Sequence, residues 1–145
     1  MYKIVRKKVL GPLVTLMEIE APYVARKAEP GQFIILRVNE YGERIPLTIA
    51  DYDRKKGTVT IIFQEVGKTT KMLASLEEGD FISDFAGPLG VPSHFEGVKK
   101  VAVVGGGLGT AIAYPQAKKL HSAGVDVDSI IGFRNKDLII LEQEM

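Results

Sequence analysis

The segment 99–110 constrains the fold more than any other part of the sequence. It reads Lys-Lys-Val-Ala-Val-Val-Gly-Gly-Gly-Leu-Gly-Thr. The four consecutive apolar residues 101–104 predict a strand that is buried on both faces, as in a parallel sheet. The glycines let the backbone turn sharply, and the residues after them predict a helix over 111–123. Strand, turn and helix N-terminus in this order direct free N–H groups and a helix dipole at one point. The segment therefore predicts an anion site at a domain boundary.

Two explanations of this glycine turn remain open. The spacing Gly105-x-Gly107-x-Gly109 differs from the dinucleotide fingerprint G-x-G-x-x-G, because Thr110 occupies the place of the last glycine. Such turns bind phosphate, and they also occur where a helix packs closely on a strand. The strand before the turn and the helix after it favour phosphate binding, with six candidate residues: Gly105, Gly106, Gly107, Leu108, Gly109 and Thr110.

Residues 1–90 have the pattern of an antiparallel barrel or sandwich, because short alternating runs are joined by tight turns. One segment, 68–76, has helical spacing instead. The segment 91–97 is a predicted linker. The expected strands are 2–10, 13–19, 32–38, 45–50, 58–65 and 81–85.

After the helix 111–123, the sequence predicts a strand at 126–133 and the start of another helix at 137–145. Pro115 should either kink the first helix or mark where its regular part begins. Nucleotide-binding sheets of this type use at least three parallel strands in their first half, and only two are present. We therefore expect a truncated polypeptide, or one that a partner completes.

The composition argues against several classes of protein. A net charge of +1 and the lack of a basic, aromatic strand pattern give no support for a nucleic-acid-binding barrel or a membrane surface protein. No apolar run approaches the roughly 20 residues of a spanning helix, and the N-terminus does not resemble a signal peptide. With no cysteine and two isolated histidines, no metal site is expected. A cytoplasmic location is the simplest expectation.

Two further segments carry polar groups that could bind a ligand. Residues 44–51 read Arg-Ile-Pro-Leu-Thr-Ile-Ala-Asp, which alone is more typical of a strand with an edge proline than of a site. Residues 67–73 read Gly-Lys-Thr-Thr-Lys-Met-Leu, which alone fits a helix cap and an anion site equally well.

Taken in order, these motifs resemble the ferredoxin–NADP reductase superfamily over essentially the whole chain. Gly-Pro-Leu-Gly at 87–90, between the second segment and the glycine turn, adds to the likeness. Within the superfamily, the chain is most similar to the small flavin subunits of NADH-dependent ferredoxin:NADP oxidoreductases, also called sulfide dehydrogenases. Dihydroorotate dehydrogenase electron-transfer subunits are near relatives.

The resemblance implies a six-stranded antiparallel Greek-key flavin-binding barrel over 1–97. A partial Rossmann-like NAD(P)-binding α/β domain then follows over 98–145. The family's flavin motif ends in Ser/Thr followed by Ile-Ala, which places Thr48 beside the flavin N5 as the catalytic residue. The arginine of this motif aligns with Ile45. Arg44, one residue earlier, is the candidate for binding the pyrophosphate. The other FAD-binding residues it implies are Pro46, Leu47, Ile49, Gly67, Lys68, Thr69 and Thr70.

In the nucleotide half, Gly105, Gly107, Gly109 and Ala111 match the family's Gly-x-Gly-x-Gly-x-Ala-Pro motif, while Ile112 replaces the proline. Arg134 follows the second strand, where it could pair with a 2′-phosphate and favour NADP over NAD. A solvated surface arginine is the alternative, so the choice between the two dinucleotides stays open.

The implied function is that of a flavoprotein electron-transfer subunit, which passes electrons between NAD(P)H, FAD and an iron–sulfur centre or a ferredoxin-linked partner. The resemblance implies a [2Fe–2S] centre in a part of the protein beyond Met145. It also implies a heterodimer with a larger catalytic flavoprotein or iron–sulfur subunit, and ferredoxin as a further partner. The alternative is a docking module without turnover that binds a catalytic subunit.

Overall fold

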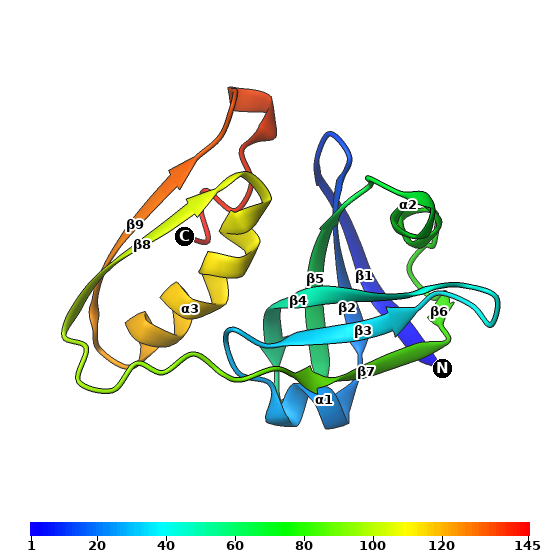
Figure 1. The fold of residues 1–145 in the computed structure, drawn as a ribbon, viewed down its shortest axis with the longest axis horizontal. Helices are drawn as coiled ribbons and strands as arrows, with labels where there is room; N and C mark the ends of the chain where they lie inside the picture. Colours follow the sequence, from blue (N-terminus) through cyan, green and yellow to red (C-terminus); the bar gives the residue numbers. More distant parts are fainter.

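The computed structural model describes all residues, 1–145, and divides them between two sheets (Figure 1). Seven antiparallel strands curve into a nearly closed barrel in the order β6-β1-β2-β5-β4-β3-β7. Strand β2 lies beside β5, across the β3–β4–β5 meander, which is a Greek-key connection. The strands are β1 (Tyr2–Gly11), β2 (Val14–Glu20), β3 (Phe33–Arg37), β4 (Arg44–Asp53), β5 (Thr58–Gln64), β6 (Phe81–Ile82) and β7 (Asp84–Leu89).

The barrel has seven strands rather than the six that we expected, because its last strand is split at Ser83. The N–H of Ser83 donates to the carbonyl of Val38 at 3.2 Å, between the two short strands. Strand β6 pairs with β1 at one end of the sheet, and β7 pairs with β3 at the other. The split strand thus brings the two ends of the sheet together.

Period-2 alternation gives the barrel two different faces. Along β5, Val59, Ile61 and Phe63 are buried in a core of 17 residues inside the barrel. Ile62 points the other way and joins a second, smaller cluster outside the barrel. Strand β2 repeats the pattern, with Met17 inside and the half-buried Leu16 outside.

Two short helices accompany the barrel. Helix α2 (Lys68–Ala74) confirms the helical stretch predicted at 68–76. Helix α1 (Pro22–Lys27) was not predicted; it begins at a proline, whose fixed φ suits a first helical turn, and it buries Val24 and Ala25 in the barrel core. Figure 1 shows α1 covering one end of the barrel.

The second part is a two-stranded parallel sheet with one helix. It consists of β8 (Lys100–Gly106), the 3₁₀ turn η1 (Gly107–Gly109), α3 (Thr110–Ser122) and β9 (Asp126–Gly132). Helix α3 runs through Pro115 without interruption, so its regular part does not begin there. No helix in the structure combines the length and apolar character needed to cross a membrane.

The expectation that 101–104 is buried on both faces is wrong. Helix α3 covers one face of the parallel sheet, and nothing covers the other. On that open face, Val104 is 68% exposed and its neighbour in register, Ile130, is 54% exposed. The continuous apolar run correctly predicted a strand in a parallel sheet, but not how much of that sheet the chain itself covers.

The helix predicted at 137–145 is also wrong. The chain forms only a 3₁₀ turn, η2 (Lys136–Leu138), and Leu141 then adopts a positive φ of 57°. Ile140 and Leu141 are buried in the cluster outside the barrel, together with Ala50, Ile62 and Ala111. We call this group of five residues the seam cluster, because it joins the barrel to the α/β half.

Candidate functional site

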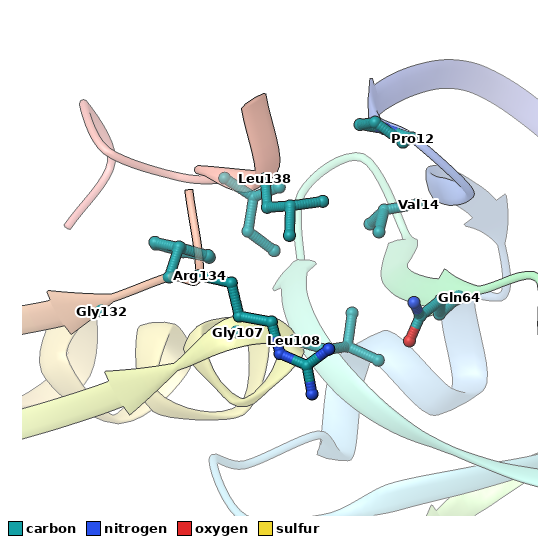
Figure 2. A pocket seen from close by; sticks show the side chains of 10 residues that line it. Pro12, Val14, Gln64, Gly107, Leu108, Gly132, Arg134 and Leu138 are labelled. Carbon is teal, nitrogen blue, oxygen red and sulfur yellow. The ribbon is translucent and has the colours of Figure 1, made fainter. Parts of the chain in front are cut away.

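Two cavities lie along the seam between the barrel and the α/β half. The first, the β4 cavity, has a volume of about 360 Å³. The second, the β9 cavity, has a volume of about 640 Å³ (Figure 2). Residues from both halves line each of them. The β4 cavity is lined by Ile45, Pro46, Leu47, Thr48, Ile62, Phe63, Gln64, Val66, Thr70, Leu108, Ala111 and Ile112. The β9 cavity is lined by Pro12, Val14, Gln64, Gly107, Leu108, Gly132, Phe133, Arg134, Leu138 and Ile140.

The β4 cavity brings together predicted residues from three motifs, because Leu108 of the glycine turn also lines it. Pro46, Leu47 and Thr48 reach it from β4, and Thr70 reaches it from α2. Register with β3 pairs Thr48 with Phe33 and leaves the threonine half-buried; its hydroxyl has no hydrogen-bond partner in the protein. The predicted Ile49 does not line the cavity, because it faces the barrel core. Apolar walls with a few polar groups are typical of a cofactor site.

The segment 67–70 forms a helix cap and also leaves backbone amides free for an anionic ligand, the two alternatives that its sequence left open. The Thr70 hydroxyl accepts hydrogen bonds from the N–H groups of Val66 and Gly67, each at 3.0 Å, which is a helix cap. Thr69 is largely buried, and its hydroxyl donates to Glu43 at 3.3 Å. The N–H groups of the first turn, from Lys68 to Thr70, have no acceptor in the protein. These amides, rather than the two hydroxyls, are the groups left free for a ligand.

Arg44 does not line either cavity. Its guanidinium lies 3.2 Å from Asp84, and Asp84 also lies 2.7 Å from Nε of Arg37. Strand register explains this arrangement, because Arg37 pairs with Arg44 on one side and with Asp84 on the other. Before Arg44 could bind a phosphate, it would have to leave Asp84.

Different glycines of the turn support different explanations, one of close packing and one of phosphate binding. A Cβ on Gly105 would lie 2.8 Å from Cα of Thr110, so this glycine permits the close packing of α3 on β8. A Cβ on Gly106, Gly107 or Gly109 would meet nothing within 4 Å. Gly107, with a φ of 54°, opens instead onto the β9 cavity. The open part of the turn is therefore accessible to a ligand.

Thr110 lies beneath this turn and is completely buried. Its hydroxyl oxygen has no hydrogen-bond partner. It belongs to the packing of α3 against β8 rather than to the wall of either cavity.

Arg134 is the only charged residue that lines the β9 cavity. It follows β9 and extends across the cavity from the α/β half toward the barrel (Figure 2). No carboxylate lies within ion-pairing distance of its guanidinium. An unpaired guanidinium next to the open glycine turn fits an anionic ligand.

Ion pairs fasten α3 to the barrel on the other side of the seam. Nζ of Lys118 lies 2.8 Å from both carboxylate oxygens of Asp51, and Lys119 pairs with Glu29, which also binds Arg54 at 2.9 Å. The hydrogen bond from Lys119, supported by Arg54, holds the pKa of Glu29 below its ordinary value against the opposing effect of burial. Burial alone would lower the pKa of Lys118, but the hydrogen bond and charge of Asp51 outweigh it and raise that pKa.

Sequence reasoning missed Gln64, which lines both cavities. The signal for it was present: alternation along 58–65 places residue 64 on the same face as Ile62, opposite Phe63. Only the structure shows that this outward face meets the α/β half. The structure contains no group of three or more side chains that could hold a metal ion.

The sequence matches known proteins over its whole length. It is 58% identical over 152 residues to a Clostridium beijerinckii protein described as an uncharacterized protein in the adh 3′ region, covering 100% of this chain and 51% of that protein. It is 44% identical over 142 residues to a Thermotoga maritima homologue of the dihydroorotate dehydrogenase B (NAD(+)) electron-transfer subunit, covering 98% of this chain and 50% of the relative. The chain thus spans about half the length of the curated relatives it matches. No model of a known protein family matches it.

Solved structures agree with these relatives. The structure of an NADH-dependent reduced ferredoxin-NADP oxidoreductase matches with a TM-score of 0.95 and 42% identity, over 100% of this chain and 53% of that one. Phthalate dioxygenase reductase matches with a TM-score of 0.84 over 99% of this chain and 46% of its own. At 17% identity, this second match shows a shared fold.

Proposed function

The chain belongs to the ferredoxin–NADP reductase superfamily, and from that membership we propose that it is an electron-transfer module binding FAD in the β4 cavity and NAD(P)H in the β9 cavity. The observation that carries the proposal is that the two cavities meet along one seam, with a turn of free backbone N–H groups beside each. FAD, when bound, accepts a hydride from a reduced nicotinamide and passes electrons on to one-electron carriers.

The residues of the β4 cavity fit a flavin. Pro46 and Leu47 give an apolar wall, and the unpartnered Thr48 hydroxyl can hydrogen-bond to the reactive ring nitrogen. The free amides of 68–70 can hold the diphosphate. Arg44 would add a positive charge once it is released from Asp84. None of these groups needs to act as a general acid or base.

The residues of the β9 cavity fit a dinucleotide. The open turn at 106–109 can receive a diphosphate against the N-terminus of α3. The relative from Thermotoga maritima is named for NAD(+) and the similar solved structure is called NADH-dependent, which favours NAD. Arg134, by contrast, is suited to a 2′-phosphate. If Arg134 binds a 2′-phosphate, Arg134→Gln should lower the affinity for NADPH relative to that for NADH. The control variant Lys136→Gln should leave this ratio unchanged. An unchanged ratio in Arg134→Gln would favour NAD.

The partners follow from the relatives' names. Because the Thermotoga maritima relative is named as a homologue of an electron-transfer subunit and the similar solved structure as a ferredoxin-NADP oxidoreductase, we infer a heterodimer with a larger catalytic flavoprotein or iron–sulfur subunit, with ferredoxin as a further partner. The chain has no cysteine, so a [2Fe–2S] centre would be held by residues outside it. The domain division at 97/98 and the cytoplasmic location remain predictions.

A titration tests this function. Adding FAD to the purified protein should perturb the flavin spectrum, and NADH or NADPH should then bleach it. If the purified protein shows no flavin absorbance and gains none on adding FAD, the electron-transfer role is rejected. The second candidate, a docking module without turnover, is favoured by the exposed Val104 and Ile130 on the open face of β8–β9. It predicts a silent titration together with intact binding to a catalytic subunit.

A further inference from the structure

Two residues, Gln64 and Leu108, line both the β4 cavity and the β9 cavity. They come from opposite halves of the molecule: Gln64 ends β5 of the barrel, and Leu108 lies in the η1 turn before α3. The two side chains therefore mark the junction where the two cavities adjoin.

Strand alternation explains why Gln64 reaches this junction. The outward face of β5 carries Thr60, Ile62 and Gln64, and Ile62 is part of the seam cluster. Two residues further along the strand, Gln64 lies beyond that cluster, beside its partner in register, Val14 of β2. Figure 2 shows the Gln64 amide extending from the barrel toward the space that Arg134 enters from the α/β half.

The chemistry of the junction singles out this side chain. Gln64 makes no side-chain hydrogen bond within the protein and is exposed to the cavities. Val14 and Leu108 beside it are apolar, and no other side-chain amide lines either cavity. A primary amide offers two donors and an acceptor, so its best match is another primary amide, which can form two hydrogen bonds with it.

We propose that Gln64 is a positioning residue that binds the carboxamide group of the nicotinamide ring. The proposal rests on the function proposed above, because a nicotinamide that meets the flavin must pass from the β9 cavity to this junction. Pairing of the two amides fixes the rotation of the ring, and the Leu108 side chain gives the ring an apolar surface opposite. The ring face turned toward the β4 cavity is thereby selected.

Equilibrium binding of oxidised ligands tests the assignment without turnover. The full chain, loaded with FAD, is titrated with NAD⁺ and with ADP-ribose, which lacks the nicotinamide. Gln64→Leu keeps the size of the side chain and removes its hydrogen bonds. We expect its Kd for NAD⁺ to rise about tenfold, as for the loss of one or two neutral hydrogen bonds, while its Kd for ADP-ribose stays within about twofold.

A modified dinucleotide gives a second test of the contact with the carboxamide. The 3-acetylpyridine analogue of NAD⁺ replaces the carboxamide NH₂ by a methyl group. The wild-type protein should bind it more weakly than NAD⁺, and Gln64→Leu should bind the two equally. The matched control is Thr60→Val, which lies on the same outward face of β5 but lines neither cavity. It should leave all three dissociation constants unchanged.

Each other outcome has a defined meaning. If Gln64→Leu weakens NAD⁺ and ADP-ribose equally, or changes neither, Gln64 does not contact the carboxamide and the assignment is rejected. If the variant loses affinity for FAD instead, the amide serves the flavin, which also rejects it. If the wild-type protein binds neither NAD⁺ nor ADP-ribose, the proposed function itself fails.

Discussion

Gly105 and Gly106 are neighbours in one turn, yet an added methyl group meets different surroundings at each. At Gly105 it would lie 2.8 Å from Cα of Thr110 and 3.0 Å from its hydroxyl oxygen; at Gly106 it would meet nothing within 4 Å. The backbone of Gly106 is extended, with φ −114° and ψ 126°, which alanine adopts freely. The two positions thus separate a packing requirement from an open binding surface.

We therefore expect Gly105→Ala to lower the free energy of unfolding by about 1–3 kcal/mol, because α3 must move away from β8. Gly106→Ala should change it by less than about 0.5 kcal/mol. Urea denaturation of the two variants checks this. Equal destabilisation would mean that the whole turn is required for packing, which would weaken the case for a phosphate site.

Thr110 gives a second prediction at this scale. Its hydroxyl is buried without a hydrogen-bond partner, a state that typically reduces stability by about 1–3 kcal/mol. Valine has nearly the same shape and no polar atom. Thr110→Val should therefore leave the melting temperature unchanged or raise it. A clear fall would show that a buried water or a bound ligand satisfies the hydroxyl.

At the scale of elements, the residue patterns predicted most strands because each strand has one buried face. The alternation along 13–19 placed Thr15 and Met17 together, and both are buried. Helix α1 escaped prediction because six residues are too few to show a period. At 137–145 the spacing of Leu138, Leu141 and Met145 fits a helix, yet Ile140 and Leu141 pack on the barrel in a chain that turns at Leu141.

The sequence also predicted part of the candidate site, namely the residues that belong to recognisable motifs. Motifs gave Thr48, Thr70 and Gly107, all of which line the cavities. They could not show that Asp84 holds Arg44, because that contact depends on strands β4 and β7, which are both paired with β3. They also could not show Gln64, whose importance depends on where the second half of the molecule lies.

The attachment of α3 to the barrel should depend on pH through Glu29. Its folded-state pKa lies below the ordinary 4.5, so its contribution to stability is present above pH 4.5 and is lost as the pH falls through the folded value. Lys119→Gln removes the main cause of the shift. Because the pair is partly exposed, we expect this variant to be less stable than wild type by at most about 1 kcal/mol near pH 7.

Urea denaturation at several pH values checks this, because the difference between the two proteins should shrink toward zero below pH 4.5. Lys27→Gln, on the exposed side of α1, is a suitable control and should show no such difference. A gap that persists in acid would show that Lys119 stabilises the protein by packing rather than by its charge.

For the whole molecule, the important asymmetry is that the barrel has a large core of its own, whereas the α/β half buries only a few apolar side chains, such as Ala117 and Leu120 of α3. The 17 buried residues of the main core all belong to the barrel. In the seam cluster, Ile140, Leu141 and Ala111 of the α/β half pack against Ala50 and Ile62 of the barrel. The α/β half is therefore stabilised largely by docking on the barrel, and it should open first.

Ile140→Ala tests this order of stability. Ile140 is 4% exposed, so its truncation should weaken the seam by about 2–5 kcal/mol. In native-state hydrogen exchange, the amides of α3 and β8 should then exchange faster, while those of β5 in the barrel core keep their protection. Val9→Ala, at a side chain that is 67% exposed on β1, should change neither set. Equal acceleration in both halves would instead mean that the barrel and the α/β half unfold as one cooperative unit.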